Sequence, residues 1–166
     1  MPAAFNPVAW STFFSAQAGA SAALTGLIFV AVSINLPKIV VLRSLVARAA
    51  KALFALMGVL LASTLGMTPG QPVKALGWEL AALGAMVWIA TTGSQHAASH
   101  RNPYVNRWQR IFQHLLTQFA AIPFAVAGVS LVFGAGGGLY WLVAGLLFSY
   151  IEALMDAWVL LVEILR

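Results

Sequence analysis

The sequence predicts an all-α integral membrane bundle of five transmembrane helices, with the N-terminus outside and the C-terminus in the cytoplasm. Its composition is the first reason. Of the 166 residues, 61% are hydrophobic and 8% are charged, and the mean hydropathy is +0.90. Soluble domains carry about 25% charged residues, so a soluble domain is excluded. The other two reasons are five apolar runs of spanning length and the uneven placement of lysine and arginine.

The five predicted spans cover about residues 9–36, 46–67, 73–96, 110–133 and 139–165, and together they form a single transmembrane domain. The first span is expected to end at Asn35-Leu36, where Pro37 follows. Residues 38–51 mix basic and apolar side chains and predict an amphipathic lead-in at the membrane surface.

The later elements follow from proline and glycine. Residues 68–72 hold two prolines and a glycine, which predicts a tight turn. Asn102-Pro103 is a candidate cap for the fourth span, and Pro123 inside that span predicts a kink. Residues 134–138 form a glycine-rich turn before the last span.

The basic residues set the predicted orientation. Five spans place almost all of them on one side, namely Lys38, Arg43, Arg48, Lys51, Arg101, Arg107, Arg110 and Arg166. The other side receives only Lys74. Because cytoplasmic connections carry the excess of lysine and arginine, the first side is assigned to the cytoplasm. The net charge of +5 is therefore a membrane signal, and nucleic acid is not expected as a partner.

The N-terminus lacks the basic region and cleavage pattern of a signal peptide, so the first span is expected to stay in the mature protein. The predicted connections are too short for a soluble catalytic domain. There is no cysteine and no visible nucleophile–base pair. We therefore expect neither an enzyme nor a bound cofactor.

The last span carries three of the four acidic residues of the chain, Glu152, Asp156 and Glu163. They lie at about 0°, 40° and 20° around a helix and form one narrow stripe. Glu79, in the outer third of the third span, could extend the series. Carboxylates inside a membrane are costly and commonly serve ion or proton paths. The stripe predicts such a path.

A structural alternative stays open for the same acids. Arg48 and Lys51, placed at the cytoplasmic end of the second span, could reach Glu163 and Asp156. Glu152 and Glu79 would then be protonated and would form hydrogen bonds between helices.

A polar stripe follows the first span, where Gln17, Ser21, Thr25 and Asn35 lie within about 80° of one another. The small residues Gly19, Ala22, Ala23 and Gly26 flank it. This pattern favours close helix packing with interhelical hydrogen bonds. The alternative is that the stripe lines a wet path opposite the acids, and Gln113, Thr117 and Gln118 could join either arrangement.

His96 and His100 have the i, i+4 spacing of a two-histidine metal site. His114 is predicted to lie opposite Ala90, more than a turn deeper than His96, so it would not complete the site. We expect no metal here, and solvated histidines at the inner surface are the favoured interpretation.

Four stretches carry a resemblance to a known family: Ala22–Leu36, Arg48-Ala49, Leu76–Leu80 and Ala157–Arg166. The sequence resembles a family of small bacterial multi-span membrane proteins, some of which are labelled "modulator of FtsH protease". The resemblance implies the bacterial cytoplasmic (inner) membrane, and it carries over no catalytic residues.

Two hypotheses of function follow. The leading one is a homo-oligomeric, channel-like protein that passes protons or cations along Glu152 and Asp156, with Glu163 at the cytoplasmic mouth. The alternative is an accessory or modulator subunit of a larger membrane complex, such as a protease or a respiratory enzyme. In that case the small residues of the first span would dock on the partner.

Overall fold

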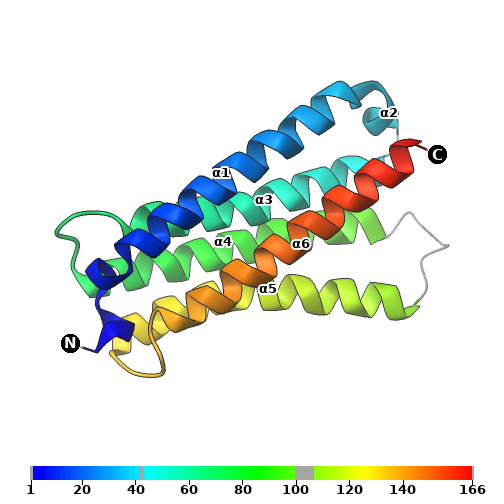
Figure 1. The fold of residues 1–166 in the computed structure, drawn as a ribbon. Helices are drawn as coiled ribbons and strands as arrows, with labels where there is room; N and C mark the ends of the chain where they lie inside the picture. The colour runs from blue at the N-terminus through cyan, green and yellow to red at the C-terminus, as the bar shows by residue number, and fades with distance from the viewer. Residues whose placement is uncertain (1, 42, 100–106, 166) are drawn as a thin grey trace.

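The computed structural model describes residues 2–41, 43–99 and 107–165; within these ranges, side chains are described except at 43, 97–99, 107, 109, 110 and 163–165. Every element in the described part is helical (Figure 1). Two short 3-10 helices, η1 (Ala3–Phe5) and η2 (Pro7–Trp10), precede the α-helices. These are α1 (Ser11–Ile34), α2 (Leu36–Val41), α3 (Arg43–Gly66), α4 (Val73–Ser99), α5 (Arg107–Phe133) and α6 (Tyr140–Leu165).

Five helical segments are long and apolar enough to cross a membrane: Pro7–Ile34, Ser44–Gly66, Val73–His96, Ile111–Phe133 and Tyr140–Val162. This confirms the prediction of an all-α fold with five candidate spans. Large apolar side chains point outward along these helices, among them Phe29, Ile89, Phe119 and Trp158. A soluble monomer rarely exposes such a continuous apolar surface, whereas acyl chains cover it at no cost. The chain is a multi-pass membrane protein.

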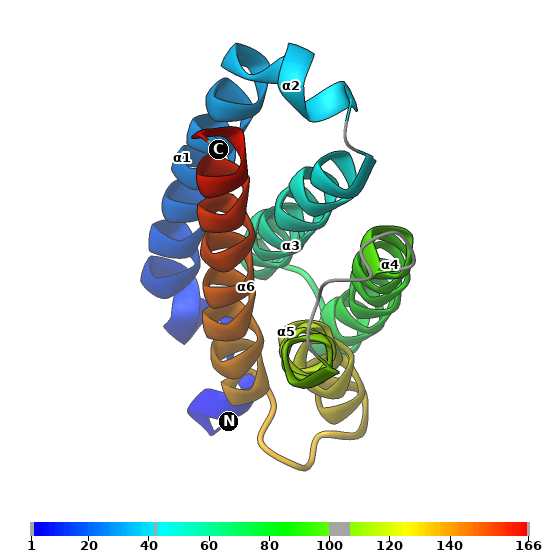
Figure 2. The same ribbon diagram turned by 90° about the vertical axis from the view of Figure 1, so that its right-hand side faces the viewer.

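The helices run back and forth between two ends of the bundle (Figure 1). One end, here called the turn end, holds η1, η2, the α3–α4 connection and the α5–α6 connection. The other, the α2 end, holds α2 and the last turn of α6. Within the bundle, α3 packs against α1, α4 and α6, and α5 packs against α4 and α6. Figure 2 shows α1 at the edge of the bundle and α2 running from α1 toward α3.

Glycines set the close packing of α4 against α5. A Cβ atom added to Gly84 would lie 2.5 Å from the backbone nitrogen of Ala125, and one added to Gly77 would lie 2.8 Å from the carbonyl oxygen of Gly128. Small residues let membrane helices approach until their backbones touch. These contacts fix the register of α4 relative to α5.

The end of the first span differs from the prediction. Helix α1 ends at Ile34 and not at residue 36, and the Asn35 side chain donates a hydrogen bond to the Ala31 carbonyl at 2.9 Å. Pro37 is the second residue of α2, where a missing backbone N–H costs little. Ile39 of α2 is buried against Leu45 and Leu160. Proline here opens a new helix, and the predicted amphipathic lead-in is divided between α2 and the start of α3.

The two turns at the turn end follow the predicted pattern. Gly70 and the four glycines between 134 and 138 all have positive φ angles, which glycine adopts without strain. The Leu139 N–H donates to the Ala4 carbonyl at 2.8 Å, so the segment before α1 is tied to the start of α6. Pro123 lies inside α5, which continues on both sides of it. Asn102-Pro103 lies outside the described residues.

Candidate functional site

Helix α6 presents two buried acids to the centre of the bundle. Glu152 and Asp156 are one turn apart and share a helix face, as the predicted stripe requires. Their exposed fractions are 1% and 3%. Both lie within the Tyr140–Val162 span, so water at the membrane surface does not solvate them. Their charges must be balanced by other side chains.

Helix α3 supplies two basic partners. Arg48 and Lys51 are three residues apart on α3, which runs antiparallel to α6 (Figure 1). Arg48 therefore lies beside Asp156, and Lys51, one turn further along α3, lies beside Glu152 as well. Arg48 Nη1 lies 3.2 Å from Asp156 Oδ1. Lys51 Nζ lies 2.9 Å from Asp156 Oδ2 and 3.2 Å from Glu152 Oε1. Lys51 thus bridges both carboxylates.

Helix α5 contributes the fifth member, Thr117. Its buried hydroxyl donates to Glu152 Oε1 at 2.5 Å and also lies 3.0 Å from the carbonyl of Gln113. One hydroxyl hydrogen serves one strong bond at a time, and a carboxylate is the stronger acceptor. We call Arg48, Lys51, Thr117, Glu152 and Asp156 the ion-pair network. It joins α3, α5 and α6 at one level of the bundle.

The ion-pair network contains two formal positive charges and two formal negative charges, so it is neutral as a whole. Buried ion pairs of this kind lose several kcal/mol of hydration, and mutual attraction returns most of it. The complete network therefore contributes little net stability, whereas the loss of one of its charges is costly. Loss of one partner leaves a bare buried charge and costs about 3–5 kcal/mol. The arrangement therefore holds α3 and α6 in one relative position.

The basic partners of the acids differ from those that the structural alternative in the sequence analysis assigned. That alternative paired Arg48 and Lys51 with Glu163 and Asp156, and left Glu152 without a basic partner. In the structure Lys51 reaches Glu152 as well. The reason is that α3 begins at Arg43, so Lys51 lies more than two turns inside the helix, at the depth of Glu152.

The other two acids of the chain are Glu79 and Glu163. Glu79 is exposed near the start of α4 and accepts a hydrogen bond from Gln71 in the preceding turn. Glu163 lies on α6, but its side chain is outside the described residues. Among the acids with described side chains, Glu152 and Asp156 share basic partners, whereas Glu79 bonds to the turn before α4.

The polar stripe of α1 bonds mainly to its own helix. Ser21 donates to the Ala18 carbonyl at 3.1 Å, and Thr25 to the Ser21 carbonyl at 2.7 Å. The Gln17 carbonyl accepts a hydrogen bond from the Tyr150 hydroxyl of α6 at 3.1 Å. The side-chain hydrogen bonds of Ser21, Thr25 and Asn35 thus go to carbonyl groups of α1 itself.

The histidine register predicted from the sequence is wrong. His96 and His114 lie opposite each other, with ring centroids 5.7 Å apart. The prediction folded the hairpin at Asn102, whereas α4 extends to Ser99 and α5 begins only at Arg107, which moves the midpoint toward α5. His100 lies outside the described residues. Among the residues described, no three His, Asp or Glu side chains gather as a metal site would require.

Two residues that link helices, Tyr150 and Trp88, were not singled out from the sequence. Tyr150 links α6 to α1, and Trp88 of α4 donates to Gln118 of α5 at 2.6 Å. A tyrosine near the middle of a span, away from the interfacial belts, was the available signal for the first. Gln95 is buried, and its amide atoms have no hydrogen-bond partner among the described residues.

The fold and the ion-pair network define a class: a multi-pass α-helical membrane protein with a charge-neutral polar centre. Comparison of the chain with protein-family models, with curated proteins and with solved structures finds no match.

Proposed function

We propose that the chain is a non-catalytic accessory or modulator subunit, which docks through α1 on a transmembrane helix of a larger membrane complex. The observation that carries the proposal is the exposure of α1. In the most apolar 18-residue stretch of this first span, 11% of the residues are buried, whereas 33–56% are buried in the corresponding stretches of the other four spans. Helix α1 packs chiefly against α3, and most of its surface is left open.

The open surface of α1 has the composition of a helix-docking face. Ser15, Gly19, Ala22 and Gly26 are exposed and lie within about 60° of one another around the helix. A Cβ atom added to Gly19 or Gly26 would have nothing within 4 Å. We call these four residues the small-residue face of α1. It has the small-xxx-small spacing that lets two membrane helices approach closely.

Glycines elsewhere in the bundle support this interpretation. Gly77, Gly84 and Gly128 lie where the backbones of α4 and α5 touch, so the fold uses glycine for close helix contact. The small-residue face of α1 offers the same surface without a neighbour in the chain. A transmembrane helix of a partner protein has the shape to cover it.

Conduction by the acids is the second candidate function, and the geometry favours it less. A conducting carboxylate must be open to water or to ions. Glu152 and Asp156 are instead buried beside Lys51 and Arg48, and the four charges cancel. This arrangement supports a structural role for the ion-pair network.

We further propose that the α2 end faces the cytoplasm of a bacterial cell and that the turn end faces outside. The helices place Lys38, Arg43, Arg48, Lys51, Arg107 and Arg110 toward the α2 end. Lys74 lies at the start of α4, at the turn end. The positive-inside rule supports this orientation, and the family resemblance of the sequence supports the bacterial cytoplasmic membrane.

The docking proposal is tested by native extraction in a mild detergent, followed by identification of co-purifying proteins. The Gly26→Leu variant is expected to lose its partner while keeping its helical content, because a leucine holds the approaching helix away. Gly93→Leu is the matched control, since Gly93 is also an exposed helical glycine with nothing within 4 Å of an added Cβ. Extraction of the wild type with copies of itself alone would contradict an accessory role.

A further inference from the structure

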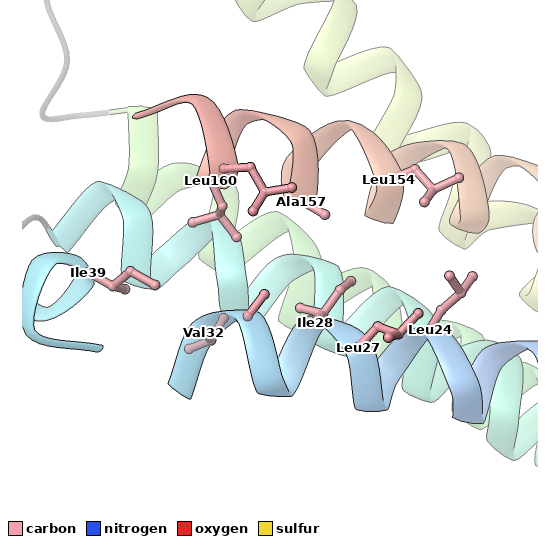
Figure 3. Close-up of a pocket in the computed structure, with 10 residues that line it drawn as sticks. Leu24, Leu27, Ile28, Val32, Ile39, Leu154, Ala157 and Leu160 are labelled. Carbon is pink, nitrogen blue, oxygen red and sulfur yellow. The ribbon is translucent and has the colours of Figure 1, made fainter. Parts of the chain in front are cut away.

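An apolar groove runs between α1 and α6 and ends at α2 (Figure 3). Its volume is about 200 Å³. Its walls include Leu24, Leu27 and Val32 of α1 and Ala157 and Leu160 of α6, and Ile39 of α2 lies at one end. All ten of its lining side chains are apolar. Water has nothing to bind in such a groove, so its occupant is apolar too.

The groove lies at membrane depth. Its α1 and α6 walls fall within the apolar spans Pro7–Ile34 and Tyr140–Val162. It exists because α1 and α6 both pack on α3 while making little backbone contact with each other. Figure 3 shows the labelled side chains of the two helices facing each other across the gap.

The size of the groove selects its occupant. An α-helix with side chains is about 10 Å across, which is far too wide for a slot of this volume. An acyl chain is a single file of methylenes, and apolar walls on both sides suit it. The groove therefore fits one lipid chain and excludes a partner helix.

Charge at the α2 end selects the kind of lipid. Lys38 immediately precedes Ile39 and is exposed. The basic residues of α2 and of the start of α3, Lys38 and Arg43, lie at this same end. Basic side chains beside an apolar site between transmembrane helices attract anionic headgroups. We propose that the groove binds one acyl chain of an anionic phospholipid, whose phosphate lies at Lys38.

This inference is independent of the proposed function. The small-residue face of α1 and the groove-lining residues of α1 point in roughly opposite directions, about 180° apart at 100° per residue. A partner helix on the small-residue face of α1 leaves the groove open, and a lipid in the groove leaves the small-residue face open.

The test counts lipids retained by the full chain in native mass spectrometry, after exposure to equal amounts of phosphatidylglycerol and phosphatidylcholine. The wild type is expected to retain one phosphatidylglycerol. Ala157→Trp fills the groove from α6 and is expected to abolish that retention. Leu27→Trp fills it from α1 and is expected to do the same, which guards against misfolding of either variant. Leu147→Trp, at an exposed α6 position outside the groove, is the matched control and keeps the lipid.

The headgroup contact is tested separately. Lys38→Gln is expected to reduce the preference for phosphatidylglycerol over phosphatidylcholine to about one, while a chain remains bound. Lys74→Gln, exposed at the turn end, should leave the preference unchanged. Three results would overturn the proposal: equal retention in the groove-filling variants and in Leu147→Trp, no retained lipid in the wild type, or a changed subunit count with unchanged lipid retention in Ala157→Trp.

Discussion

At the scale of single residues, the fold depends on Lys51. Its ammonium lies 3.2 Å from Glu152 and 2.9 Å from Asp156, and its exposed fraction is 5%. No other described basic side chain pairs with Glu152. The charge balance of the centre is therefore lost if Lys51 is removed.

The Lys51→Met variant keeps the length of the side chain and removes the charge. We expect it to lower the free energy of unfolding by about 3–5 kcal/mol, because two carboxylates are left with a single arginine. Unfolding in mixed micelles of mild and denaturing detergent measures the change. Lys74→Met, at an exposed position, should change stability by less than about 0.5 kcal/mol. Equal effects of the two substitutions would contradict a buried role for Lys51.

Thr117 is expected to matter less. Its Oγ1 donates to Glu152 at 2.5 Å, and hydrogen bonds between membrane helices contribute about 0.6 kcal/mol on average and about 1.7 kcal/mol at most. Thr117→Val should lower stability within that range in the same unfolding experiment. Thr64→Val is the control, because Thr64 is exposed and donates only to the Leu60 carbonyl of its own helix. A larger loss in the control would count against the bond to Glu152.

The sequence was informative about which residues share a helix face and less so about which residues meet. The 100° step per residue placed Glu152 and Asp156 on one face, and the structure agrees. The Lys51–Glu152 pair was not predicted. A shift of a few residues in the start of α3 changes the depth of Lys51 in the bundle by about one helical turn, and the start of a helix is not fixed that closely by sequence. The same sensitivity misplaced His114 relative to His96.

At the scale of helices, the α4–α5 pair depends on backbone contact at glycine. Gly84→Leu is expected to destabilise the fold by about 1–3 kcal/mol or more, because a Cβ there already meets the Ala125 backbone at 2.5 Å. Gly93→Leu on the same helix meets nothing within 4 Å and should be nearly neutral. Thermal unfolding in detergent, followed by circular dichroism, compares the two. Equal midpoints would mean that α4 and α5 do not pack as described.

The helices themselves were largely predictable, because a bilayer demands apolar runs of a set length. Each predicted span overlaps a helix of the structure. The break between α1 and α2 was not predictable. A proline fits equally well just after a helix and in the first turn of the next one, and only the packing of Ile39 on Leu45 and Leu160 decides between them.

At the scale of the whole molecule, we propose separate roles for one buried region and two surfaces. The ion-pair network holds the centre, the small-residue face of α1 is offered to a partner helix, and the groove beside α6 is offered to a lipid. The basic charge lies toward the α2 end. Which helices face lipid and which face protein could not be read from the sequence, because all five spans are similarly apolar.

A neutral, buried centre predicts that the protein does not conduct. Reconstituted into liposomes loaded with a pH-sensitive dye, it is expected to pass protons no faster than empty liposomes under an imposed gradient. The Glu152→Gln/Asp156→Asn double variant should behave like the wild type in this assay. Proton flux that exceeds the background and falls in the double variant would favour the conduction hypothesis.

The central claim is that the acids of α6 are held by the basic residues of α3. A double-mutant cycle on Lys51→Met and Glu152→Gln, measured as free energy of unfolding in detergent, tests it most directly. If the two side chains are paired, the double variant should be more stable than the sum of the single losses predicts, by about 0.5–3 kcal/mol. Additive losses, with a coupling energy near zero, would mean that Lys51 and Glu152 do not interact and that the account is wrong.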